Sequence, residues 1–163
     1  SGRYSSLITA KKIKSNIDLG FVGEVARVDI TLLERLLEAN IIPVVSPVGR
    51  GRDGEIYNIN ADYSAAKIAV ALGAEKMFVL TNVRGVLKNP KDQNSLFNTL
   101  KAKDVRRLIK KGIICDGMIP KACACLIAVK RGVKKAHIVS AALPHALLLE
   151  IFTREGIGTE ILK

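Results

Sequence analysis

The chain has 163 residues, 48% of them apolar, and a net charge of +11 at neutral pH, a composition that fits one folded domain and excludes disorder. No apolar run approaches the roughly 20 residues that a membrane helix needs, so no membrane partner is expected. Three cysteines without paired Cys or His spacing predict neither disulfides nor a metal site, and they suit a reducing compartment such as the cytoplasm, or the plastid stroma if the source is photosynthetic.

The first part of the chain predicts a polar arm, an extended segment and a helix. Within the first twenty residues, Leu7-Ile8-Thr9 is the best strand, and Phe21–Val28 follows as an extended segment. Asp29 can cap a helix that runs to about Asn40. The residues predicted to face inward from this helix are Ile30, Leu33, Leu36 and Leu37.

The next stretch predicts a strand, a loop, a helix and a second strand. Ile41–Ser46 reads as a short apolar strand, and Gly49–Gly54 reads as a loop whose tip suits a turn. Ala61–Ala71 predicts a helix closed by Gly73. Lys76–Thr81 is the most convincing buried parallel strand in the sequence.

The rest of the chain repeats this alternation of helices and strands. In order, the predicted elements are a polar loop at 88–95, a helix at about 102–111 that ends at Gly112, a helix from Pro120 to Gly132, a strand at Ala136–Val139, a helix at Pro144–Phe152 and a strand near Thr159–Leu162. Buried strands that alternate with helices predict an α/β fold with a mainly parallel sheet. With no linker or repeat in the sequence, we expect residues 1–163 to form a single domain.

Much of the positive charge lies around the helix at 102–111. Its apolar stripe of Val105, Leu108 and Ile109 leaves the basic side chains on the solvent side. These are Lys101, Lys103, Arg106, Arg107, Lys110 and Lys111. Aromatic residues are only 4% of the chain and Trp is absent, so a stacking surface for nucleic acid is poorly supplied. We expect a solvated face or an acidic protein partner, and no nucleic acid.

The segment Gly117-Met118-Ile119-Pro120-Lys121 places a lysine just inside the start of a helix. Pro120 fits the first helical position, where its missing N–H would have no intrahelical partner. A cation there opposes the helix dipole, whereas the backbone N–H groups of a helix start suit an anion. A phosphate opposite Lys121 would explain the lysine, and a solvated surface lysine is the other interpretation.

Two further segments carry polar groups where ligands collect in α/β folds. Asn58 and Asn60 alternate with an apolar residue, so both amides can face one polar ligand, and Asp62 follows at a helix start. The same residues are also ordinary helix caps. The loop Thr81–Leu87 combines hydrogen-bonding groups with Gly85, which allows close backbone approach or simply makes a turn.

Together these segments offer a cation, a carboxylate and amides, which fit phosphoryl transfer because that chemistry depends on positioning and charge neutralisation. No P-loop is present, which excludes a Walker-type ATPase. His137 lies in an apolar strand and is interpreted as a satisfied core residue, and His145 as a local structural residue.

Five phrases, taken together, resemble the amino-acid kinase family, and within it the branch that acts on N-acetylglutamate. They are Leu19–Val25, Tyr57–Asp62, Gly117–Lys121, Pro144–Glu150 and Glu155–Thr159. They run through nearly the whole chain in family order. The resemblance implies a carbamate kinase-like, three-layer α/β/α fold. It also implies phosphorylation of the side-chain carboxylate of N-acetyl-L-glutamate by ATP, giving N-acetyl-L-glutamyl 5-phosphate in arginine biosynthesis.

The resemblance also implies a role for each matching residue. Lys121 matches the lysine that stabilises the transferring phosphoryl group, and Asp62 matches the carboxylate that holds the catalytic lysines. Asn58 and Asn60 match the acetylglutamate side. The nucleotide side is matched by Thr81, Asn82, Gly85, Leu87, Gly117 and Met118. Mg²⁺ is expected on the phosphates of ATP rather than in a protein cage.

The chain also departs from the family pattern. Asn82 stands where the family usually has aspartate, and Ser140-Ala141-Ala142 stands where it usually has Asp-Gly-Arg. The N-terminal half, which carries most of the acetylglutamate pocket, is expected to be missing, and the chain alone is then expected to be inactive. A non-catalytic nucleotide-binding or interaction module is the alternative. The resemblance further implies a homo-oligomer and allows an arginine effector or a PII-type regulator.

Overall fold

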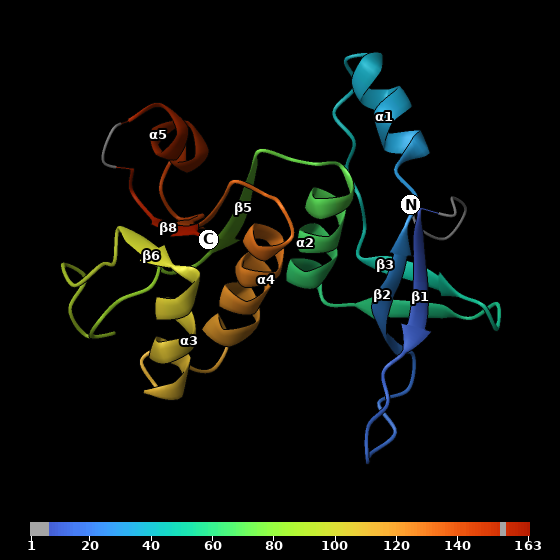
Figure 1. Ribbon diagram of the computed structural model, residues 1–163, viewed down its shortest axis with the longest axis horizontal. Helices are drawn as coiled ribbons and strands as arrows, with labels where there is room; N and C mark the ends of the chain where they lie inside the picture. The colour runs from blue at the N-terminus through green and yellow to red at the C-terminus, as the bar shows by residue number, and fades with distance from the viewer. Residues whose placement is uncertain (1–6, 154–155) are drawn as a thin grey trace. The chain divides into compact units, whose positions relative to one another are not determined.

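Residues 7–153 and 156–163 are described by the structure, a computed structural model, and the chain falls into two units, Ser1–Leu72 and Gly73–Lys163 (Figure 1). The predicted N-terminal arm begins at residues 1–6 and the last of the five phrases begins at Glu155, and these residues lie outside the described part. The two units are taken in turn below. That residues 1–163 act as a single domain stays a prediction.

The first unit contains a closed barrel of four short strands, joined in the order β1-β2-β4-β3. The strands are β1 Ile8–Lys12, β2 Val22–Val28, β3 Val48–Gly51 and β4 Ile56–Ile59. The pairs β1–β2 and β3–β4 are antiparallel, whereas β1–β3 and β2–β4 are parallel. Its buried core consists of Leu7, Ile8, Ala10, Val25, Leu33, Tyr57 and Ile59.

Two helices complete this unit, α1 (Thr31–Glu38) and α2 (Ala61–Ala71). The N-cap residue of α1 is Ile30, without a side-chain capping hydrogen bond, so the prediction of Asp29 as the cap was wrong by one position; the Asp29 carboxylate instead accepts the Thr31 N–H at 3.1 Å just before the helix. Leu33 is buried as predicted, but Leu37 is 48% exposed. The prediction for Leu37 was wrong because only one narrow face of this eight-residue helix meets the core.

The segment between α1 and α2 differs most from the sequence prediction. Ile41–Ser46 is not a strand, and Ile42 and Val44 are 88% and 94% exposed. Pro43 has no N–H to give to a ladder, so this apolar run is poorly suited to pair. The predicted loop at Gly49–Gly54 instead begins with β3, and only its tip turns.

Glycine has a packing role in β3. A Cβ on Gly49 would lie 2.9 Å from the Ala10 Cβ and 2.9 Å from the Ile8 Cγ2, so the strand can approach β1 only without a side chain there. Gly49 resembles a turn residue in the sequence, but in the structure it allows β3 to pack closely against β1 in the barrel.

The second unit is built on a four-stranded sheet in the order β5-β7-β8-β6. Its strands are β5 Lys76–Thr81, β6 Thr99–Lys101, β7 Lys135–Ser140 and β8 Thr159–Leu162. The pairs β5–β7 and β6–β8 are parallel, and β7–β8 is antiparallel. The predicted α/β class is confirmed, β5 and β8 coincide with the predicted strands, and the three-residue β6 was not predicted.

Three helices cover this sheet: α3 (Ala102–Lys110), α4 (Met118–Lys130) and α5 (Ala146–Phe152). Figure 1 shows α5 on one side of the sheet and α3 and α4 on the other, so this unit has three layers. All of β7 except its first residue is buried between them. Among the described residues, no helix is long and apolar enough to cross a membrane.

Candidate functional site

The second unit holds a cavity of about 360 Å³ where β5 ends and α4 begins. Its walls come from three segments: the loop after β5, the loop before β6 and the turn into α4. The lining residues are Thr81, Asn82, Val83, Gly85, Val86, Leu87, Pro90, Gln93, Ile113, Cys115, Asp116, Gly117, Met118 and Lys121. The structure therefore brings together every residue that was predicted for the nucleotide side, and adds Lys121 to them.

The first wall begins at the last residue of β5. The Thr81 carbonyl accepts the Ala141 N–H at 2.7 Å, which continues the β5–β7 pairing, and its hydroxyl donates to the Asn82 Oδ1 at 3.4 Å. Thr81 is buried and Asn82 is exposed, so the chain leaves the sheet between them. The carboxyl ends of two parallel strands thus open at this edge, where α/β folds bind ligands.

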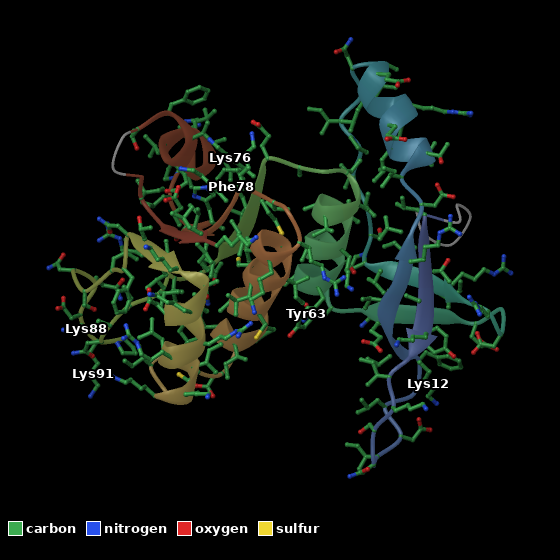
Figure 2. The ribbon with its side chains drawn as sticks, in the orientation of Figure 1. Lys12, Tyr63, Lys76, Phe78, Lys88 and Lys91 are labelled. Atoms are coloured by element: carbon green, nitrogen blue, oxygen red, sulfur yellow. The ribbon has the colours of Figure 1, made fainter. Side chains whose placement is uncertain are left out.

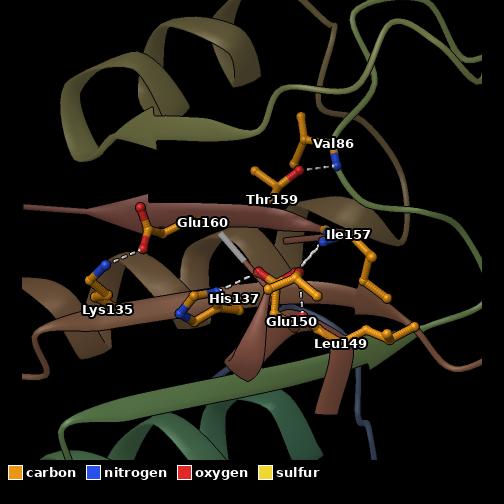
Figure 3. A network of polar contacts seen from close by, with 10 residues as sticks. Val86, Lys135, His137, Leu149, Glu150, Ile157, Thr159 and Glu160 are labelled. Carbon is orange, nitrogen blue, oxygen red and sulfur yellow. Dashed lines mark hydrogen bonds and ion pairs between the residues drawn. The ribbon is translucent and has the colours of Figure 1, made fainter. Parts of the chain in front are cut away.

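The loop that follows is fixed from the far end of the chain. The Val86 N–H donates to the Thr159 Oγ1 at 2.9 Å, and both residues are buried (Figure 3). A Cβ on Gly85 would lie 2.6 Å from that same oxygen, so glycine permits the close approach of the loop to β8. The Phe97 N–H donates to the Val86 carbonyl at 2.9 Å, so Val86 is held on both sides.

The loop before β6 closes the same side of the cavity. The Lys88 N–H donates to the Ser95 carbonyl at 2.8 Å, and the Arg84 guanidinium donates to the Gln93 carbonyl at 3.3 Å. Lys88 and Lys91 lie on the exposed part of this loop (Figure 2). The sequence indicated only a polar loop here, so Pro90 and Gln93 were not predicted as lining residues.

Lys121 is half-buried in the first turns of α4. The sequence predicted Pro120 as the first residue of the helix. The helix begins at Met118, so Pro120 is its third residue. The Met118 N–H already donates to the Cys115 carbonyl and the Ile119 N–H to the Asp116 carbonyl, both at 3.0 Å. Attraction for an anion therefore comes more from the Lys121 ammonium and the helix dipole than from these backbone donors.

The turn into α4 also places a thiol and a carboxylate on the cavity wall. A hydrogen bond to the Asp116 carboxylate is the main cause that raises the pKa of the exposed Cys115, which keeps this side chain a thiol at neutral pH. Both residues directly precede the segment that the sequence singled out, so proximity to Gly117 was the one available signal for them. Among the described residues, no group of three or more His, Cys, Asp or Glu gathers as a metal site.

The residues predicted for the acetylglutamate side lie in the first unit, where β4 leads into α2. Asn58 is exposed near the end of β4. The Asn60 Oδ1 accepts the N–H groups of Asp62 and Tyr63 at 3.0 and 3.2 Å, so Asn60 caps α2. Asp62 is half-buried in the first turn of α2, where a carboxylate suits the helix dipole.

A second polar cluster lies on the other face of the sheet, between β7 and α5 (Figure 3). The His137 Nδ1 is 2.7 Å from the Glu150 Oε1, and the Glu150 Oε2 accepts the N–H groups of Ile157 and Gly158 at 2.6 and 2.9 Å. The Phe78 and His137 rings are stacked, with their centroids 4.7 Å apart. His137 is a core residue as predicted, although its Nε2 has no hydrogen-bond partner within residues 7–153 and 156–163.

The family model for the amino acid kinase family matches residues 1–140. The chain is 50% identical over 161 residues to the acetylglutamate kinase of Caldanaerobacter subterraneus subsp. tengcongensis, covering 99% of this chain and 54% of that protein. It is 48% identical over 163 residues to the acetylglutamate kinase of Desulforamulus reducens, covering 99% and 57%. The chain thus spans about half the length of the curated relatives that it matches.

Solved structures agree on the fold. The N-acetylglutamate synthase of Neisseria gonorrhoeae, in complex with coenzyme A and L-arginine, matches with a TM-score of 0.87 at 29% identity, over 98% of this chain and 37% of that one. The carbamate kinase of Giardia lamblia bound to AMP-PNP matches with a TM-score of 0.69 at 20% identity, over 87% of this chain and 47% of that one.

Proposed function

The chain belongs to the amino acid kinase family, and on that premise we propose that it is the ATP-binding half of an acetylglutamate kinase. The observation that carries this proposal is that one cavity gathers Lys121 with the loop after β5. The identities of 50% and 48% to acetylglutamate kinases favour this substrate among the acceptors of the family. The reaction transfers the γ-phosphoryl group of ATP to the side-chain carboxylate of N-acetyl-L-glutamate.

The cavity suits a nucleotide because apolar residues and a lysine line it together. Its apolar residues can pack against a purine and sugar, and they are Val83, Val86, Leu87, Pro90, Ile113 and Met118. Lys121 supplies the positive charge for the phosphates, which is the main requirement of phosphoryl transfer. Mg²⁺, bound through the phosphates, would supply further charge neutralisation and needs no protein cage.

In this reaction, an oxygen of the acceptor carboxylate attacks the γ-phosphorus, and the bond to the β–γ bridging oxygen breaks. Lys121 stabilises the negative charge on the transferring group. The family resemblance assigns Asn58 and Asn60 to the acceptor, and it assigns Asp62 to holding the catalytic lysines of the family. Because the Asn60 Oδ1 caps α2, Asn60 would contact the acetylglutamate through its side-chain NH₂ group.

Calorimetry of this chain with ATP and Mg²⁺ tests the proposal. Lys121→Ala is expected to weaken ATP binding about tenfold, because it removes a charged contact to the phosphates. Lys130→Ala is the matched control, since Lys130 is exposed in the last turn of the same helix. The loss should be larger for ATP than for ADP if Lys121 serves the terminal phosphate. Equal losses for both nucleotides, or none, would count against this role.

A second candidate is a non-catalytic nucleotide-binding or interaction module. One observation favours it: Asn82 offers the cavity an amide where the family pattern has a carboxylate. An interaction module need not bind ATP, so calorimetry with ATP separates it from the kinase. A nucleotide-binding module that has lost catalysis differs from the kinase only in turnover, and it is tested by ADP release from a full-length acetylglutamate kinase that carries asparagine at the position matching Asn82.

A further inference from the structure

We propose that Thr159 is a positioning residue for ATP binding: its Oγ1 holds the loop Asn82–Leu87 in the shape that forms one wall of the cavity. The proposal rests on the proposed function for the identity of the ligand. Thr159 itself does not line the cavity. It therefore acts through Val86, which does.

The geometry of the contact supports this role. Thr159 is 0% exposed, Val86 is 2% exposed, and the 2.9 Å hydrogen bond joins residues that lie 73 positions apart. A buried N–H without a partner is costly, so removing the Oγ1 acceptor would drive Val86 to move until its N–H reaches water. The same movement would displace the cavity wall.

Gly85 gives a second, independent sign of this contact. A Cβ on Gly85 would lie 2.6 Å from the Thr159 Oγ1, so a side chain at this position would clash with that oxygen. The loop and β8 are thus fitted to each other at this point in both shape and hydrogen bonding.

The position of Thr159 is in turn secured by the turn that precedes it. The Glu150 carboxylate accepts two successive backbone N–H groups, from Ile157 and Gly158, immediately before β8 begins. Beyond Thr159, the pairing of β8 with β7 and β6 continues. A rigid anchor on both sides is what a positioning residue needs to impose its geometry on a loop.

Thr159→Val tests the proposal, since valine keeps the shape of threonine and removes the acceptor. Two measurements are made: hydrogen exchange of the Val86 amide without nucleotide, and affinity for ATP with Mg²⁺. We expect both the exchange rate and the dissociation constant to rise about tenfold. Thr159→Ser, which keeps the oxygen, should restore both to within about threefold of the wild type. Ile161→Val is the control for lost packing, because Ile161 is fully buried on the same strand.

The outcomes separate this proposal from the proposed function. Unchanged Val86 exchange in Thr159→Val, or unchanged ATP affinity in a chain that binds ATP, overturns the positioning role. Equal effects of Ile161→Val and Thr159→Val overturn it too, because they would show a general loss of packing. If the wild-type chain binds no ATP, the proposed function fails, and exchange at Val86 alone decides whether Thr159 holds the loop.

Discussion

At the scale of single residues, the contact between Asp53 and Tyr57 makes the stability of the first unit depend on pH. The Tyr57 hydroxyl donates to the Asp53 Oδ2 at 2.5 Å, and this hydrogen bond is the main cause that lowers the pKa of Asp53 below its ordinary value of 3.8. Because the folded-state pKa is lowered, the stabilisation is present above pH 3.8 and is lost as the pH falls through the lower folded value.

Asp53→Asn should therefore destabilise the protein at pH 7 and have progressively less effect as the pH falls below 3.8. Urea unfolding followed by tyrosine fluorescence measures this, because the chain has no Trp and its three tyrosines all lie in residues 1–72. Glu38→Gln, at an exposed position on α1, is the control. A constant difference between wild type and Asp53→Asn at pH 7 and at low pH would contradict the assignment.

At the scale of elements, α5 is attached to the sheet through a polar side chain. Only Ala146 and Glu150 of this helix are buried, and Phe152 is 80% exposed. Glu150→Ala would leave the His137 Nδ1 and two backbone N–H groups without their acceptor, so we expect a loss of about 3 kcal/mol or more in the free energy of unfolding.

Glu150→Gln separates the hydrogen bonds from the charge. The glutamine amide oxygen can accept the two backbone N–H groups while its NH₂ donates to the His137 Nδ1. The free energy of unfolding should therefore fall by about 1 kcal/mol. Thermal and urea unfolding followed by circular dichroism measure both variants. If Glu150→Ala costs no more than Glu150→Gln, the carboxylate does not anchor α5.

The elements also show where sequence reasoning succeeds and where it stops. β5 was predicted with the correct bounds because its apolar run Met77–Leu80 is short and ends at a polar loop, and β8 was predicted near its observed bounds just after Gly158. Ile41–Ser46 was predicted as a strand on the same grounds and is not one, since local apolarity does not say whether a neighbouring strand is available. β3 was missed because Gly49 reads as a turn in sequence and acts as a packing residue in space.

The candidate site follows the same rule. Residues 81–87 and 117–121 were predicted from local pattern and from the resemblance, because ligands gather where strands end and helices begin. The contact from Thr159 to Val86 was beyond prediction, since no spacing rule pairs residues that are 73 positions apart. The sequence also predicts Asn60 as an ordinary helix cap, and the structure confirms that capping contact.

At the scale of the whole molecule, this chain should bind ATP but should not catalyse phosphoryl transfer to acetylglutamate. The 163 residues cover 54% and 57% of two acetylglutamate kinases, and we expect turnover to need the length of those proteins that the 163 residues do not cover. A coupled assay should detect no acetylglutamate-dependent ADP release above background, with a full-length relative as the positive control. Robust turnover would show that the chain supplies all the groups that the reaction needs.

The cavity lies wholly within residues 73–163, whereas Asn58, Asn60 and Asp62 all precede Gly73. On the proposed assignment, the residues for the phosphoryl donor and those for its acceptor lie in consecutive stretches of the chain. If so, substitutions in the earlier stretch would change acceptor specificity and leave ATP binding unchanged.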